Sequence, residues 1–202
     1  MKSFALFLLA AACASAQQLP NGLYAIFNTS MGNITAKLYE KDAAITVENF
    51  VALAQGTKAS RNPKTGAMVK RPFYDNITFH RVVQGEMIQA GDPTGKGSFD
   101  CGVNIRDEFL PGLRFDGGGQ LAMANTGDPD SGGCQFFITV GPMRQWDGKY
   151  TIFGSVVEGQ KVVWQINHQP VRGDKPVDPA KLLSVTIARV GPEPVKKVKK
   201  KK

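Results

Sequence analysis

The residue whose type and position first suggest chemistry is Arg81, which lies inside a predicted strand rather than in a loop. Side chains alternate between the two faces of a strand, so Arg81 shares a face with Phe79. A guanidinium group is costly to bury among apolar side chains unless it has partners. Arg81 therefore either serves a site or reaches solvent from an edge strand, and this pattern alone does not separate the two.

The stretch around Arg81 is expected to form a hairpin. Two short apolar runs, Ile77–Val83 and Met87–Ala90, flank a break at Gln84-Gly85-Glu86, which is the pattern of two strands and a turn. The whole stretch, Phe73–Asp92, is the part of the chain around which we expect the other elements to be arranged.

The usual catalytic constellations are missing from the sequence. No Cys/His spacing fits zinc, only two histidines occur, and no serine lies in a nucleophile-elbow motif. There is no phosphate-binding loop and no dinucleotide fingerprint. The loop with Asp128 and Asp130 faintly resembles a calcium site but lacks its ligand spacing and terminal glutamate. We therefore expect neither a metal nor a cofactor.

The remaining candidate residues suit the binding of an extended peptide. They combine an arginine, two glutamines, apolar and aromatic groups and a strand-like backbone: Arg81, Gln89, Gln135, Met87, Phe137, Trp146 and Ala124-Asn125. Such a set offers an apolar pocket, side-chain amides that hydrogen bond to peptide groups, and a free backbone edge.

The elements that must position these residues indicate a β-rich domain. Short strands are predicted at residues 23–28, 32–39, 77–83, 87–90, 120–124, 135–140, 150–157 and 183–190, and helices at about 42–55 and 159–166. Asp42 is the expected cap of the first helix, and Thr57–Arg71 is expected to be a surface loop. Strands and two helices without βαβ alternation favour an antiparallel barrel or sandwich.

Residues 1–16 have the pattern of a secretory signal peptide. A basic start precedes the apolar run Phe4–Ala14 and an Ala14-Ser15-Ala16 cleavage pattern. The run is too short to span a bilayer as a stable helix. We expect the mature protein to begin at Gln17 and to be periplasmic or secreted, with lipid attachment through Cys13 as the less favoured alternative.

The net charge of +8 comes almost entirely from the chain ends. Six of the charges lie on C-terminal lysines and a seventh on Lys2, so the rest of the chain carries +1. Basic runs of this kind are typically solvated and disordered. We expect one domain over residues 17–191, a disordered lysine-rich tail over residues 192–202, and no binding of nucleic acid.

Two cysteines, Cys101 and Cys134, would remain after removal of the signal peptide. In an oxidising compartment they could form one disulfide, or they could be two separate, partly buried thiols. Their spacing alone leaves both possibilities open.

Four motifs in order resemble the cyclophilin family of peptidyl-prolyl cis–trans isomerases. They are Phe79-His80-Arg81-Val82-Val83-x-Gly85-x-Met87-Ile88-Gln89-x-Gly91-Asp92, Ala122-Met123-Ala124-Asn125, Gln135-Phe136-Phe137-Ile138-Thr139 and Asp147-Gly148-Lys149-Tyr150-x-Ile152-Phe153-Gly154. The resemblance runs from about Leu23 to Val190, and the 91–97 turn and the 58–71 insertion look like those of bacterial exported members. It implies a mainly β fold, a closed eight-stranded antiparallel barrel capped by two α-helices.

The resemblance also implies roles for the candidate residues. Arg81 would be catalytic, donating to the nitrogen of a twisted X–Pro amide. Met87, Phe137, Trp146 and Tyr150 would surround the proline, Gln89 would hold Arg81 and the substrate carbonyl, the Asn125 backbone would pair with the peptide, and Ala124 and Gln135 would line the neighbouring groove. The expected partners are proline-containing segments of unfolded or folding proteins, bound by a monomer.

By the same resemblance, the loop with Cys101 should lie beside the loop that ends at Gln135, which implies a Cys101–Cys134 disulfide. His80 should face away from Arg81, where a structural hydrogen bond is expected rather than a catalytic role.

Glu86 departs from the family pattern, which usually has a large apolar residue at this position. A carboxylate on the wall of a proline pocket would be expensive to desolvate and could compete for Arg81. Either Glu86 turns to solvent, or the pocket is more polar and activity is reduced. Two functions follow: an isomerase that assists the folding of exported proteins, or a peptide-binding chaperone module of the same fold with low turnover.

Overall fold

The computed structural model describes residues 19–193. The expected signal peptide, the alternative lipid attachment at Cys13 and most of the expected lysine-rich tail lie outside the described residues. Within them, no helix is both long and apolar enough to cross a membrane.

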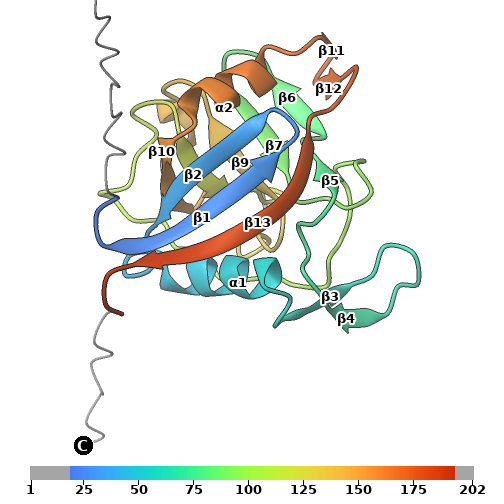
Figure 1. Ribbon diagram of the computed structural model, residues 1–202, viewed down its shortest axis with the longest axis horizontal. Coiled ribbons are helices and arrows are strands. Elements are labelled where there is room, and N and C mark those ends of the chain that lie inside the picture. Colours follow the sequence, from blue (N-terminus) through green and yellow to red (C-terminus); the bar gives the residue numbers. More distant parts are fainter. Residues whose placement is uncertain (1–18, 194–202) are drawn as a thin grey trace, which may run out of the picture.

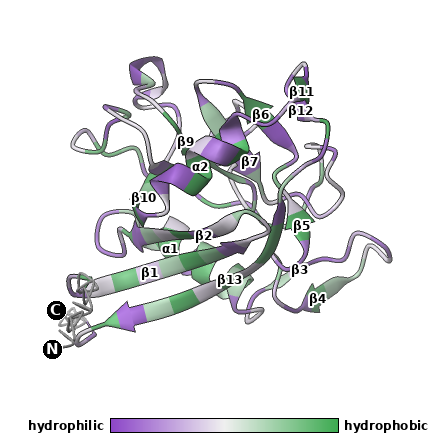
Figure 2. Cartoon of the chain, turned by 45° about the horizontal axis from the view of Figure 1, so that its top comes forward, coloured by the Kyte–Doolittle hydropathy of each residue, from purple (hydrophilic) through white to green (hydrophobic). Residues whose placement is uncertain are grey.

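One strongly curled antiparallel sheet dominates the molecule (Figure 1). Its strands are β1 (Gly22–Thr29), β2 (Gly32–Leu38), β5 (Ile77–Thr78), β6 (Arg81–Val83), β7 (Met87–Ala90), β8 (Gln120–Met123), β9 (Phe136–Thr139), β10 (Ile152–Glu158) and β13 (Lys181–Val190). Their spatial order is β5-β13-β1-β2-β10-β8-β9-β7-β6. Hydrophobic and hydrophilic residues are interleaved along β13, as expected for a strand with one face toward the core (Figure 2).

The sheet curls back on itself because its two edge strands, β5 and β6, are consecutive in the chain. Only Phe79 and His80 separate them, and the Phe79 N–H donates to the Ala180 carbonyl over 3.0 Å. The strand expected over residues 77–83 is therefore interrupted, so the sheet has nine strands where the resemblance implied eight. The expected mainly β, barrel-like antiparallel fold is confirmed, with this link joining the two edges of the sheet.

Two helices lie on opposite sides of the curled sheet (Figure 1). They are α1 (Ala44–Ala54) and α2 (Gln160–Asn167), close to their predicted ranges. Phe50 on α1 lies in the aromatic core, with its ring centroid 5.0 Å from that of Tyr74 and 5.2 Å from that of Phe153. This contact fixes α1 against the end of the barrel.

The expected cap of α1 by Asp42 is wrong. Ala43 occupies the N-cap position and makes no side-chain cap. The Glu108 carboxylate accepts the Thr46 N–H at 2.9 Å, the Thr46 hydroxyl at 2.8 Å and the Ile45 N–H at 3.1 Å. A distant loop therefore satisfies the donors that a local cap would have taken.

Two small hairpins were not predicted. Strands β3 (Ala59–Arg61) and β4 (Met68–Lys70) pair within the stretch expected to be a surface loop and project from the body of the molecule (Figure 1). Strands β11 (Val171–Arg172) and β12 (Lys175–Pro176) pair between α2 and β13. A short 3₁₀ helix, η1 (Arg144–Trp146), lies in the loop before β10.

Candidate active site

Arg81 opens strand β6 and is held at the surface by two partners. Its side chain is 47% exposed, and its cross-strand neighbour on β7 is Gln89. Arg81 Nη1 donates to Gln89 Oε1 at 3.3 Å, while Nε and Nη2 both donate to Asp174 Oδ2, at 3.1 and 3.0 Å. The guanidinium thus remains hydrated on one side, which avoids the cost of burial, and is oriented on the other.

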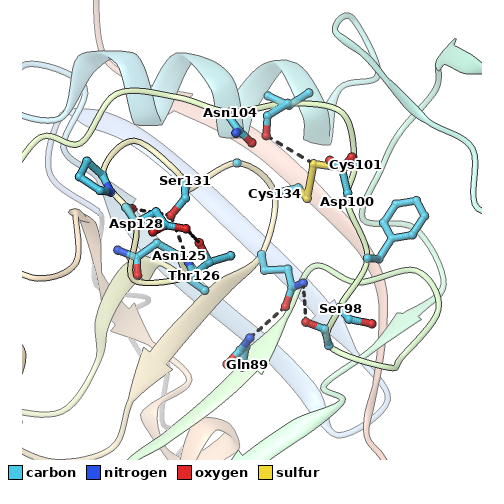
Figure 3. Close-up of a pocket in the computed structure, with 17 residues that line it drawn as sticks. Gln89, Ser98, Asp100, Cys101, Asn104, Asn125, Thr126, Asp128, Ser131 and Cys134 are labelled. Atoms are coloured by element: carbon cyan, nitrogen blue, oxygen red, sulfur yellow. Dashed lines mark hydrogen bonds between the residues drawn. A yellow bond between two sulfur atoms is a disulfide. The ribbon is translucent and has the colours of Figure 1, made fainter.

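The hydrogen bonds continue from Gln89 across the sheet. Gln89 Nε2 donates to Gln135 Oε1 at 2.9 Å, and Gln135 Nε2 donates to the Gly97 carbonyl at 3.1 Å (Figure 3). Each amide thus has its oxygen facing one neighbour and its nitrogen facing the next, which fixes its orientation. The predicted residues Arg81, Gln89 and Gln135 form one connected row.

An apolar cluster, separate from the main core, adjoins this row. Its buried members are Met87, Phe115, Ala122, Phe137, Met143 and Ile152, and its partly buried rim includes Ala124, Trp146 and Tyr150. The Phe137 ring lies at its centre, with ring centroids 5.2 Å from Tyr150 and 5.3 Å from Trp146. Phe137 is also the cross-strand neighbour of Gln89, so the apolar cluster lies directly beside the polar row.

Phe115 belongs to the cluster but was not identified from the sequence. Its ring stacks on Phe137 at 6.0 Å between centroids and meets the edge of Trp146 at 5.9 Å. Phe115 lies in a loop without periodic pattern, so only these contacts reveal it. Asp174 was also not identified from the sequence, because it lies in a turn and only its contact with Arg81 reveals it.

Asn125 follows the end of β8 and presents a free backbone. Among the hydrogen bonds found within residues 19–193, none uses its main-chain N–H or C=O. Its side chain donates to the Lys149 carbonyl at 2.9 Å and accepts the Gly127 N–H at 3.2 Å. The side chain therefore holds the loop in place while the main chain is available to an extended ligand.

A cavity of about 530 Å³ lies beside the polar row, and Figure 3 shows the residues that line it. Four predicted residues line it, namely Gln89, Ala124, Asn125 and Gln135. Ala124 belongs both to this cavity and to the rim of the apolar cluster. The apolar cluster, Asn125 and the cavity thus form neighbouring parts of one site.

Cys101 and Cys134 form a disulfide in the wall of the cavity (Figure 3). It joins the loop after β7 to the loop before β9, across a sequence separation of 33 residues. By limiting the unfolded chain, a cross-link of this span contributes about 2–4 kcal/mol to stability. The two loops that line the cavity are therefore held together covalently.

The buried Asp92 carboxylate organises another part of the wall. It accepts the Thr94 N–H and hydroxyl and the Gly97 N–H, each at 2.6 Å, and the Phe99 N–H at 3.2 Å. Burial raises the pKa of Asp92, but these hydrogen bonds outweigh burial and leave its pKa below the ordinary value. The ionised carboxylate thereby fixes the turn that supplies the carbonyl bonded by Gln135.

The structural hydrogen bond expected of His80 is not well formed, although the Thr78 backbone and the Gln135 side chain lie close enough to its ring to raise its pKa. The residue is buried, and neither ring nitrogen has a hydrogen-bond partner within the described part of the chain. Burial holds the pKa of His80 below its ordinary value even though the Asp92 charge acts in the opposite direction. His80 is thus a neutral, buried side chain beneath the site.

Glu86 lies in the turn between β6 and β7 and is partly exposed. Its carbonyl accepts the Val140 N–H at 2.8 Å. Within residues 19–193 its carboxylate forms neither an ion pair nor a hydrogen bond, and Arg81 pairs with Asp174 instead. The same residues contain no group of three or more His, Cys, Asp or Glu side chains arranged to hold a metal ion.

The chain is similar to known isomerases over most of its length. Residues 24–187 match the family model described as cyclophilin type peptidyl-prolyl cis-trans isomerase/CLD. Peptidyl-prolyl cis-trans isomerase A of Mycobacterium tuberculosis is 46% identical over 167 residues, covering 81% of this chain and 91% of that protein. Peptidyl-prolyl cis-trans isomerase B of Streptomyces anulatus is 44% identical over 169 residues, covering 82% and 96%.

The fold is also similar to a solved structure. A cyclophilin type peptidyl-prolyl cis-trans isomerase of Cryptosporidium parvum, crystallised in the presence of the dipeptide Ala-Pro, has a TM-score of 0.71 and 28% sequence identity. The match covers 83% of this chain and 99% of that one.

The burial of His80 predicts that acid destabilises the protein. Because its pKa is lower in the folded protein than the ordinary 6.5, the unfolded chain binds the proton first, so stability falls as pH drops below about 6.5. We expect the urea-unfolding free energy of the wild type to fall from pH 7.5 to 5.5, by at most about 1.4 kcal/mol per pH unit through this group. His80→Gln should remove this slope.

The matched control is His168→Gln, because the other histidine is exposed. This variant should keep the wild-type pH slope. Equal slopes in wild type and His80→Gln would contradict the prediction.

Proposed function

The chain belongs to the cyclophilin-type peptidyl-prolyl cis–trans isomerase family, and from this premise we propose that it accelerates X–Pro isomerisation in exported proteins as they fold, with Arg81 as its catalytic residue. The activity itself is peptidyl-prolyl isomerisation. The observation that carries the assignment to Arg81 is its position beside the apolar cluster, oriented by Gln89 and Asp174.

The reaction needs no nucleophile, because no covalent bond breaks. Amide resonance gives rotation about the C–N bond a barrier of about 18–20 kcal/mol, and uncatalysed X–Pro isomerisation takes roughly tens to hundreds of seconds. At the top of the barrier the bond is twisted and the proline nitrogen regains a lone pair. An N–H donor aimed at that nitrogen binds the twisted state better than the planar one, which lowers the barrier.

Arg81 has donors available for this task. A guanidinium has five N–H groups, and Gln89 and Asp174 accept three of them. One N–H on Nη1 and one on Nη2 are left without an acceptor among the described residues. Because the group is already oriented, these donors need little rearrangement when a substrate binds.

The remaining residues of the site would hold the peptide. The ring of a substrate proline would enter the apolar cluster around Phe137, while the free main chain of Asn125 would pair with the extended peptide. The cavity beside Gln135 would take a neighbouring residue of the peptide. Crystallisation of the Cryptosporidium parvum relative in the presence of Ala-Pro supports this proposal.

Arg81→Ala should abolish most of the turnover without unfolding the protein. The lost donor should lower kcat/KM about 10²–10³-fold, measured as isomerisation of a proline peptide by the chain from Gln17 to Lys202. The melting temperature should change little, since the Arg81 side chain is half exposed.

Arg172→Ala is the matched control, because Arg172 is an exposed arginine on the neighbouring β11–β12 hairpin. It should keep wild-type turnover. A folded Arg81→Ala protein with wild-type kcat/KM would remove Arg81 from the catalytic role.

The alternative function is a peptide-binding chaperone module with low turnover, and Glu86 is the residue that motivates it. Because the Glu86 carboxylate is partly exposed and bonds to neither Arg81 nor another described side chain, we expect Glu86→Phe to change kcat/KM by less than about twofold. Glu86→Gln, which removes the charge at nearly constant size, is the control. A gain of tenfold or more in Glu86→Phe would favour the low-turnover module.

Export is supported by the signal-peptide pattern of residues 1–16 and by the Cys101–Cys134 disulfide, which is typical of oxidising compartments. We expect intact-mass analysis of the exported protein, made from the full-length chain, to give a first residue of Gln17. A lipid-modified chain beginning at Cys13 would favour the alternative of membrane attachment. Retention of an uncleaved chain inside the cell would contradict export.

A further inference from the structure

We propose that Asp174 is a positioning residue for catalysis, which fixes the guanidinium of Arg81 in the orientation that the reaction requires. This inference rests on the proposed function of Arg81 and adds a second residue to it. It assigns a role to the β11–β12 hairpin, which lies outside the four motifs of the sequence.

The hairpin presents Asp174 to strand β6 through its main chain. Its turn contains Gly173, whose φ of +62° is a conformation that favours glycine. The Val82 N–H donates to the Asp174 carbonyl at 2.8 Å. Because Val82 is the next residue after Arg81, this main-chain bond holds the hairpin close to Arg81 independently of the side-chain contacts.

The carboxylate then accepts two donors from one edge of the guanidinium. Arg81 Nε lies 3.1 Å and Nη2 3.0 Å from the same oxygen, Asp174 Oδ2. Gln89 Oε1 accepts from Nη1. With acceptors at Nε, Nη1 and Nη2, the planar group cannot rotate without breaking at least one of these bonds, so the two remaining N–H groups have a defined direction.

The Arg81–Asp174 ion pair contributes little to the folding stability of the protein. The two side chains are 47% and 53% exposed, and exposed ion pairs contribute little to folding because water and salt screen them. Losing Asp174 should therefore leave the fold intact while freeing a long side chain to adopt other rotamers. The expected loss is in rate, because a small misplacement of a catalytic group slows the reaction.

The test compares Asp174→Ala and Asp174→Asn in the mature chain. We expect Asp174→Ala to lower kcat/KM about tenfold, mainly through kcat, with an unchanged melting temperature. Asp174→Asn should stay within about twofold of wild type, because its amide oxygen can accept the same two hydrogen bonds. In ¹⁵N NMR spectra, the Arg81 Nε–H resonance should move or broaden in Asp174→Ala and recover toward its wild-type position in Asp174→Asn.

Asp178→Ala is the matched control, because Asp178 is an exposed aspartate in the same segment that makes no side-chain hydrogen bond within residues 19–193. It should change neither kcat/KM nor the Arg81 resonance. Wild-type kcat/KM in Asp174→Ala, or an equal loss in Asp174→Asn and Asp174→Ala, would overturn positioning by these hydrogen bonds. Absence of turnover in the wild type would instead overturn the proposed function, and the NMR comparison would still report on the orientation of Arg81.

Discussion

The interruption at Phe79-His80 is the constraint on which the site depends. It ends β5, begins β6 and thereby joins the two edges of the curled sheet. The first residue after the interruption is Arg81. The same short link therefore closes the curled sheet and places the candidate catalytic residue Arg81. A continuous strand over this stretch would place Arg81 on the same face as Phe79, as the sequence pattern predicted. Because the strand is interrupted, Phe79 and His80 are both buried while Arg81 turns outward.

The site places a charged group beside an apolar pocket rather than inside it, which avoids the cost of burying the charge. The Arg81 guanidinium stays at the surface, where water still reaches it, and the cluster around Phe137 supplies the apolar surface one strand away. Gln89 connects the two, since it pairs across strands with both Arg81 and Phe137. Strand register therefore sets the spacing between the donor and the pocket that would hold the proline.

The loops around the cavity are held by strong local interactions, although they have little regular secondary structure. The buried Asp92 carboxylate fixes one turn through four hydrogen bonds, and the Cys101–Cys134 disulfide joins the two loops on either side. A binding surface built on irregular backbone loses less entropy on binding when it is already ordered. The disulfide in the wall of the cavity, and the buried Asp92 charge behind the turn that lines it, provide this order.

Local pattern was sufficient to predict most strands and both helices. The four motifs pointed to Arg81, Gln89, Gln135 and Phe137 as candidate residues, and the structure brings these four together. Strand alternation and helical spacing act between near neighbours, so they can be recognised without knowing the fold. Asp174 and Phe115 could not be found in this way, because Asp174 meets Arg81 across 93 residues and Phe115 lies in an irregular loop. The cap of α1 came from Glu108 rather than the nearby Asp42 for the same reason. Such contacts depend on the register and curl of the whole sheet, which decide which distant side chains meet.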